Sequence, residues 1–182
     1  MDEHVCPWWF AYTFDHRFRR LIHQPEKMLN GLVRDGHTVI DIGCGMGFFA
    51  IAMAKMVGES GRVIAVDLQA KILEVLQRRA RKSGVLSRIH LHQCEQDRLG
   101  ISEPVDFALA FWMVHEVPDT KNLLRQVRAL LKPKAHFLVV EPKIHVPHAR
   151  FKQIVDSACE VGLKIDSEPQ VAMSRAVVFK TS

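Results

Sequence analysis

Three glycines at alternate positions, Gly43, Gly45 and Gly47, form the strongest chemical signal in the sequence. An apolar run that ends in Asp41-Ile42 precedes them and an alanine-rich segment follows, which predicts a buried strand, a tight turn and a helix. Glycine lets a ligand approach main-chain atoms where a Cβ would stand in the way. The start of the following helix presents free N–H groups and a positive dipole end, so the loop predicts a site for an anionic group.

An acidic residue ends the next hydrophobic run, where Asp67 follows Val63-Ile64-Ala65-Val66. A carboxylate at the tip of a second parallel strand can accept hydrogen bonds from both ribose hydroxyls of an adenosine ligand. We expect Asp67 to have no part in the core, because it stands at a strand tip. The glycine spacing G-x-G-x-G, with Asp41 inside the preceding strand, differs from the G-x-G-x-x-G of dinucleotide dehydrogenases.

Candidate bases lie in two later segments. His115 and Glu116 follow one apolar run, and Glu141 and His145 follow the next. Ligands of open α/β sheets bind beyond the carboxyl ends of the strands, so both segments should border one site. An imidazole with an ordinary pKa of about 6.5 suits a general base. The alternative for His115 is that it only packs beside the next helix.

The remaining histidines and cysteines do not predict a metal site. His145 and His148 lack a third ligand in the pattern, and His90, His92 and Cys94 alternate along one face of a predicted strand. Zinc takes three or four protein ligands. We therefore expect no bound metal.

The spacing of apolar residues predicts the scaffold for these groups. Short β-branched runs alternate with helical patterns from residue 39 onward, which indicates βαβ units and an α/β fold with a mostly parallel sheet. The predicted strands are Thr38–Ile42, Arg62–Asp67, Ile89–Gln93, Val105–Phe111, His136–Glu141, Leu163–Ser167 and Arg175–Lys180. The predicted helices are a short one from Pro25, the alanine-rich one, Lys71–Ser83, Thr120–Lys132 with Asp119 as its N-cap, and Ala149–Val161.

The composition is that of an ordinary globular protein. Of the 182 residues, 48% are hydrophobic and 25% are charged, which excludes a disordered chain and predicts a single domain over residues 1–182. The net charge of +5 would assist the approach of an anionic partner without identifying one. No apolar run reaches the ~20 residues of a membrane span and no secretory signal is visible. Four scattered cysteines fit a reducing compartment, so we expect a cytoplasmic protein without a membrane partner.

The first 35 residues differ from the rest of the chain. They contain an aromatic cluster, with Trp8, Trp9 and Tyr12, ahead of the short helix. Aromatic clusters pack into a core or cover a binding site. We expect residues 1–35 to form an N-terminal helical and aromatic cover, with Trp8, Trp9 and Tyr12 as candidates for contact with a substrate. Packing on the core alone is the alternative.

At the glycine loop and Asp67, the chain resembles the class I S-adenosylmethionine-dependent methyltransferases, in particular the small UbiE-like group, over residues of about 25 to 180. The resemblance implies a Rossmann-like fold with a seven-stranded sheet of order 3-2-1-4-5-7-6, helices on both faces and the last strand antiparallel. It implies S-adenosylmethionine as cofactor and S-adenosylhomocysteine as product. The cofactor-binding residues that it implies are Asp41, Gly43, Gly45, Gly47, Asp67, Leu68, Glu95, Gln96 and Phe111.

Further segments carry the resemblance, with two departures. The segment from Trp112 to Asp119 looks like the family's element after strand four, which flanks the transferable methyl group. Leu130-Leu131-Lys132-Pro133 is similar to the family's turn before strand five, but Lys134-Ala135 replaces its double glycine, so we expect a turn of another form. Cys94-Glu95 stands where Gly-Asp is usual, which brings a longer acid to the adenine contact.

The resemblance implies methyl transfer from S-adenosylmethionine. We expect a small-molecule acceptor, since the chain has no large inserted domain and aromatic residues stand near the site. His115 and Glu116 are the candidate catalytic residues, and Trp112, Met113 and His145 are further candidates for the substrate site. A sulfonium donor is already activated, so proximity alone is an alternative to a general base.

Two other functions stay open on the sequence. The first is an RNA or protein methyltransferase that uses a basic face, which is possible but not favoured because a solvated helix face is the ordinary explanation for such residues. The second is a non-catalytic S-adenosylmethionine-binding regulator or partner protein. We expect a monomer or a homodimer. The basic residues in question are Arg78, Arg79, Arg81, Lys82 and Arg88.

Overall fold

A computed structural model of the protein describes residues 22–182, and its centre is a seven-stranded sheet of order β3-β2-β1-β4-β5-β7-β6. The order and the Rossmann-like fold that the resemblance implied are confirmed. The parallel strands are β1 (Thr38–Ile42), β2 (Arg62–Asp67), β3 (Ile89–Gln93), β4 (Val105–Phe111) and β5 (Leu131–Pro142). The last strand, β7 (Ser174–Lys180), runs antiparallel to both β5 and β6 (Lys164–Ser167).

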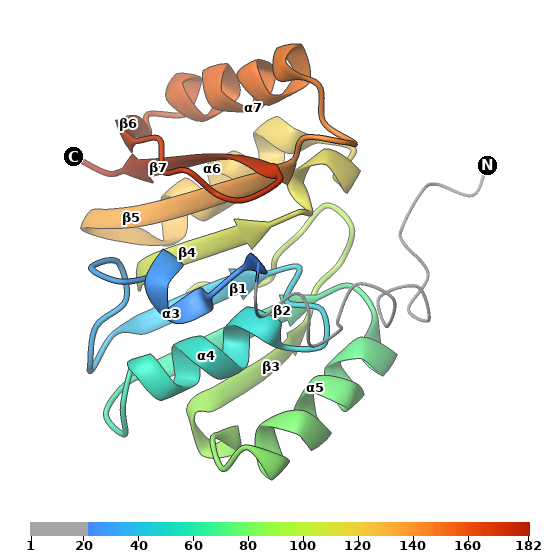
Figure 1. Cartoon of the computed structure of the whole chain (residues 1–182), viewed down its shortest axis with the longest axis vertical. Helices are drawn as coiled ribbons and strands as arrows, with labels where there is room; N and C mark the ends of the chain where they lie inside the picture. The colour runs from blue at the N-terminus through green and yellow to red at the C-terminus, as the bar shows by residue number, and fades with distance from the viewer. Residues whose placement is uncertain (1–21) are drawn as a thin grey trace.

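Helices cover both faces of this sheet (Figure 1). On one face, Phe49 and Met53 of α4 and Leu76 of α5 pack against strand residues such as Val39. On the other face, Leu124 of α6 and Ile154 of α7 join a second apolar cluster. Figure 1 shows α4 in front of the sheet and α6 behind it. The helices are α3 (Pro25–Met28), α4 (Phe48–Met56), α5 (Ala70–Lys82), α6 (Thr120–Leu130) and α7 (His148–Glu160), with short 3-10 turns η1 (Leu86–Arg88) and η2 (Val114–Glu116).

The central strands are buried on both faces, which explains their nearly continuous apolar sequences. In β1, every residue from Val39 to Ile42 is buried, and β4 is buried except at Asp106. Asp119 caps α6 as expected, because its side chain accepts the N–H of Asn122 at 2.8 Å. Within residues 22–182, no helix has the length and apolar character needed to cross a membrane.

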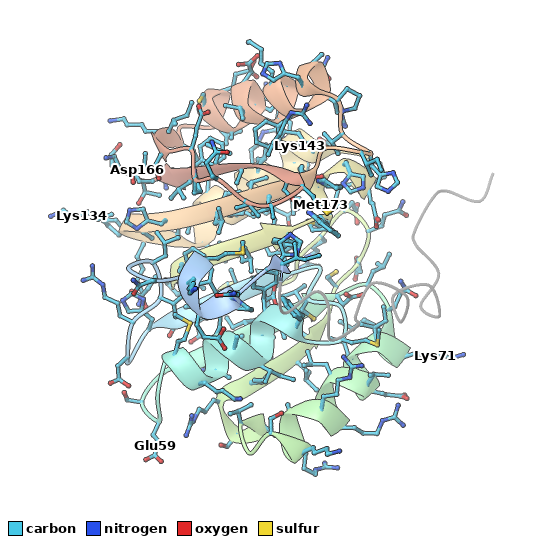
Figure 2. The ribbon with its side chains drawn as sticks, viewed as in Figure 1. Glu59, Lys71, Lys134, Lys143, Asp166 and Met173 are labelled. Atoms are coloured by element: carbon cyan, nitrogen blue, oxygen red, sulfur yellow. The ribbon has the colours of Figure 1, made fainter. Side chains whose placement is uncertain are left out.

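Strand β5 begins earlier than expected, at Leu131 rather than at His136. The predicted helix to Lys132 ends at Leu130, because Leu131 already pairs with Val105 of β4. Lys134 adopts φ 62°, the left-handed conformation that favours glycine, so the backbone at this position is strained in the absence of the family's glycine. Lys134 lies at the amino end of β5, far from Met173 at the other end (Figure 2).

Candidate active site

A cleft of about 1040 Å³ lies along the carboxyl ends of the five parallel strands. The loops after β1, β2, β3, β4 and β5 all contribute to its walls, as open α/β sheets require. His115, Glu116 and His145 border this cleft together with the glycine loop. The two segments of candidate bases therefore meet at one cavity.

The three glycines of the loop have positive φ angles of 67°, 51° and 86° but different surroundings. A Cβ on Gly43 would lie 2.9 Å from the Cβ of Met113, so Met113 packs directly over this residue. A Cβ on Gly45 would have nothing within 4 Å, and Gly45 borders the cleft. A Cβ on Gly47 would lie 2.0 Å from Cδ1 of Leu76, so Gly47 allows α4 to approach α5 and lies outside the cleft lining.

Asp67 both borders the cleft and holds the loops around it. Its Oδ2 accepts the N–H of Gly45 at 3.0 Å and its Oδ1 accepts the N–H of Gln69 at 3.0 Å. Burial raises the pKa of Asp67, against the lowering effect of hydrogen bonds from main-chain N–H groups. Asp67 is only 8% exposed, so the expectation that it has no part in the folded core is wrong.

The other residues implied for cofactor binding also border the cleft. Asp41 is 2% exposed at the end of β1, and Phe111 is buried at the end of β4. Leu68 is half-buried, whereas Glu95 and Gln96 are exposed in the loop after β3. That loop is fixed to α6, because Asn122 and Gln126 donate to the carbonyl of Asp97 over 2.7 and 2.8 Å.

Trp112 is held in a strained conformation at the edge of the cleft. Its φ of 60° is unusual for a bulky residue. Its N–H donates to the carbonyl of Val140 at 2.7 Å and its Nε1 donates to Oγ of Ser174 at 2.9 Å. Strained residues persist where the surroundings over-determine them, often in binding sites. No sequence pattern predicted the contribution of Ser174, which is 62 residues away in the chain.

His115 forms a close pair with Glu141. The imidazole Nδ1 contacts Oε2 of Glu141, whose side chain is 0% exposed. Burial lowers the pKa of His115, but the hydrogen bond and charge of Glu141 and the charge of Glu116 outweigh it, so the pKa is raised. The ring of His145 lies nearly parallel to that of His115, with centroids 6.5 Å apart and planes at 10°. Glu116 is exposed at the cleft.

Apolar side chains form the rim beside these imidazoles. Ile144 and Met173 border the cleft although they are 81% and 62% exposed. They belong to adjacent segments, because the N–H of Lys143 donates to the carbonyl of Met173 at 3.0 Å. Figure 2 shows Lys143 and Met173 on the same side of the molecule. Trp8, Trp9 and Tyr12 lie outside the described residues.

Of the candidate group His90, His92 and Cys94, only Cys94 borders the cleft. His90 and His92 lie along the edge strand β3 with ring centroids 6.3 Å apart. In the part of the chain that the structure describes, no three His, Cys, Asp or Glu side chains are arranged to hold a metal ion. Of the basic residues considered, Arg79 donates to the carbonyl of Met46 and Arg88 to that of Ala54.

Comparisons with known proteins agree with this geometry. A solved structure of a SAM-dependent methyltransferase from Aquifex aeolicus superposes with a TM-score of 0.86 at 21% identity, over 98% of this chain and 100% of that one, which shows the fold. Demethylmenaquinone methyltransferase of Lactobacillus johnsonii is 30% identical over 110 residues, which cover 60% of this chain and 45% of that protein.

A second relative, the ubiquinone/menaquinone biosynthesis C-methyltransferase UbiE of Cellvibrio japonicus, is 34% identical over 110 residues, or 60% of this chain and 44% of that protein. The chain thus spans less than half the length of these two curated relatives. Residues 33–173 match the family model described as a methyltransferase domain. With the strand order, the glycine loop and this match over most of its length, the chain belongs to the methyltransferase-domain family.

Proposed function

We propose that the protein transfers a methyl group from S-adenosylmethionine to a small-molecule acceptor and releases S-adenosylhomocysteine. The observation that carries this proposal is a single cleft bordered by Gly45, Asp67 and His115. Gly45 offers an open main-chain surface, Asp67 offers a carboxylate, and His115 offers a proton acceptor. These groups come from the loops after β1, β2 and β4, so one elongated ligand can reach all of them.

The chemistry of the cleft suits this cofactor. Six of the described residues that border it carry carboxylates, whereas Arg98 is the one arginine or lysine among them. An acidic lining attracts the sulfonium and ammonium groups of S-adenosylmethionine. We assign the ribose hydroxyls to Asp67 and the methionine end to Asp41 and the glycine loop, with Leu68, Glu95, Gln96 and Phe111 around the adenine. The six are Asp41, Asp67, Glu95, Asp97, Glu116 and Asp119.

When bound, the cofactor supplies a methyl group on a positively charged sulfur, which needs an aligned nucleophile and a dry site. Trp112 and Met113 supply apolar walls that exclude water. We assign the general base to His115, because Glu141 and the exposed Glu116 both favour its protonated form after it has taken a proton. Glu116 then contributes to catalysis through its negative charge, which raises the pKa of His115.

The acceptor in this proposal is small and largely apolar. Ile144 and Met173 extend the apolar wall to the mouth of the cleft, where His145 offers a polar contact. The names of the two relatives point to quinone-type acceptors. Quinols are therefore the first acceptors to test.

Two measurements test the proposal. S-adenosylhomocysteine at 100 times its Kd should stabilise the protein by about 2.7 kcal/mol in a thermal-shift assay, while NAD should not. A screen of metabolites, quinols included, should then reveal label transferred from methyl-labelled cofactor. Binding without transfer to any acceptor would instead favour a regulatory protein, and salt-dependent binding and methylation of RNA would favour the nucleic-acid alternative.

We further propose that residues 1–35 form a cover over the cleft. Deletion of residues 1–13 should abolish turnover and leave most of the affinity for S-adenosylhomocysteine. A truncated protein that fails to fold would instead assign Trp8, Trp9 and Tyr12 to the core. Circular dichroism of the truncated protein separates the two results.

A further inference from the structure

Glu141 stands where one side chain can fix both the position and the tautomer of His115. Its Oε1 accepts the main-chain N–H of Val114 at 2.9 Å, and its Oε2 contacts Nδ1 of His115. The carboxylate therefore binds the main chain and the side chain of two consecutive residues in η2. Since Glu141 lies on β5 and η2 follows β4, the pair joins the ends of two neighbouring strands.

The chemistry of the carboxylate dictates which ring nitrogen carries the proton. An ionised carboxylate only accepts hydrogen bonds. A neutral imidazole beside it must therefore carry its hydrogen on Nδ1, which leaves the lone pair on Nε2. His115 borders the cleft, so Nε2 is the ring atom available to a ligand.

The cost of burying Glu141 argues against a role in packing alone. The preceding residues of β5, Val139 and Val140, are as fully buried as Glu141 but are apolar. A buried carboxylate is costly unless it is paired and hydrogen-bonded. An apolar residue would fill this position at lower cost, so the carboxylate indicates a function that an apolar side chain could not perform.

Four groups surround the imidazole, and three of them shift its pKa. Glu141 on β5 and Glu116 on η2 raise the pKa of His115, while Arg150 on α7 lowers it. The ring of His145, from the loop after β5, lies parallel to that of His115. Glu141 alone among these four has a hydrogen bond to the imidazole in the described structure.

We propose that Glu141 is a positioning residue for methyl transfer, which holds His115 in the Nδ1–H tautomer so that Nε2 takes a proton from the acceptor. This inference rests on the proposed function. In the step, a nucleophilic atom of the acceptor, such as a ring carbon of a quinol, forms a bond to the methyl carbon, and the electron pair of the broken carbon–sulfur bond stays on sulfur. The proton of the acceptor hydroxyl moves to Nε2 of His115, so charge and atoms balance.

Glu141→Gln tests the tautomer directly. The N–H of Val114 requires the amide oxygen of the new side chain, so the amide NH₂ is left facing Nδ1 of His115. That group donates, and the ring must move its own hydrogen to Nε2. We expect kcat to fall by at least ~10²-fold, with the Kd for S-adenosylhomocysteine within about threefold of the unmodified protein. The midpoint of any residual rate–pH profile should move to lower pH.

Asp106→Asn is the matched control. Asp106 accepts the N–H of Thr38 at 2.9 Å and pairs with Lys132 at 2.8 Å, so it also bridges a main-chain N–H and a cationic side chain. It starts β4, at the end of the sheet away from the cleft. The same change from carboxylate to amide should leave kcat within about threefold of the unmodified protein. An equal loss of kcat in both variants would overturn the positioning role.

Nitrogen-15 NMR gives a readout that needs no acceptor. The His115 signals, assigned by their loss in His115→Ala, should show the Nδ1–H tautomer in the unmodified protein and the Nε2–H tautomer in Glu141→Gln. An Nε2–H tautomer in the unmodified protein, or unchanged signals in Glu141→Gln, would overturn the inference. If Glu141→Gln does not fold, the tautomer of His115 in the unmodified protein still tests the inference, since Nδ1–H supports it and Nε2–H overturns it. Absence of transfer to every acceptor would refute the proposed function while the NMR result still reports the His115–Glu141 pair.

Discussion

The N–H of Gly45 donates to Oδ2 of Asp67 over 3.0 Å, so the glycine loop is held by a carboxylate from the neighbouring strand. This bond joins the two strongest signals of the sequence into one structural unit. Removal of the Asp67 carboxylate would therefore also remove a hydrogen bond that holds the glycine loop in place. Substitution of Asp67 should lower both the affinity for the ligand and the free energy of unfolding.

Asp67→Ala should weaken S-adenosylhomocysteine binding by at least tenfold and also destabilise the protein. Hydrogen bonds to charged groups contribute ~1.5–3 kcal/mol each, and the main-chain N–H of Gly45 would lose its acceptor. Calorimetry gives the Kd and urea unfolding gives the free energy. Asp156→Ala, which removes only an exposed pair with Lys152, is the control and should change neither beyond ~0.5 kcal/mol. Unchanged affinity in folded Asp67→Ala would refute the ribose assignment.

Gly45→Ala and Gly47→Ala should separate ligand binding from folding. A Cβ at Gly45 meets open space, so the cost to stability is the ~1–2 kcal/mol of a left-handed alanine, while the new methyl group obstructs the cofactor. A Cβ at Gly47 would collide with Leu76, so this variant should lose more stability. Thermal unfolding with and without S-adenosylhomocysteine measures both effects. The reverse ranking of stabilities would contradict the packing described for α4 and α5.

Lys134→Gly should stabilise the protein, by up to ~1 kcal/mol. Lysine at φ 62° is strained, and glycine relieves the strain at some cost in unfolded-state entropy. The melting temperature should rise by up to ~2–4 °C with turnover unchanged. Lys164→Gly makes the same chemical change in strand β6 and should instead destabilise by ~0.5–1 kcal/mol. If both variants are destabilised, Lys134 is not a source of strain.

The stabilising contribution of His115 should depend on pH. Its pKa is raised in the folded protein, so the protonated imidazole stabilises the fold fully below its unfolded pKa of about 6.5. This contribution is lost as the pH rises through the folded pKa. The difference in free energy of unfolding between the unmodified protein and His115→Ala should therefore shrink from pH 5.5 to pH 8.5 in urea titrations. A difference that grows with pH would mean a lowered pKa.

The thiols should differ in their reaction with iodoacetamide at pH 8. Burial raises the pKa of Cys94 to about 11, and burial also raises that of Cys44, so little thiolate forms at either. Among these three described cysteines, Cys159 is exposed and should react before Cys44 and Cys94. Because Cys44 and Cys94 border the cleft, S-adenosylhomocysteine should slow their labelling further and leave Cys159 unaffected. Peptide mass spectrometry resolves the three sites, and ligand protection at Cys159 alone would contradict the location of the site.

Local pattern was enough to predict much of the scaffold. The strands β1, β2, β3 and β4 have the predicted bounds, since an apolar run between turn residues is a property of consecutive residues. The N-cap at Asp119 follows from the same kind of information. The tight turn at the glycine loop was also predicted, and its three glycines adopt positive φ angles, which cost glycine less than any other residue. The strand order came from the family resemblance.

Contacts between distant segments required the tertiary structure. The pairs His115–Glu141 and Trp112–Ser174 join residues 26 and 62 positions apart. Gly47, at the start of α4, lies so close to Leu76 of α5 that a side chain at Gly47 would collide with it. Such contacts depend on which strands are neighbours and in what register. In a parallel sheet, the carboxyl ends of separate segments lie at one edge. The periodicity within a segment does not predict which side chains from different segments are in contact there. Sequence therefore determined which groups are available for chemistry, and the packing of β4 against β5 and of β5 against β7 determined which of them act on one another.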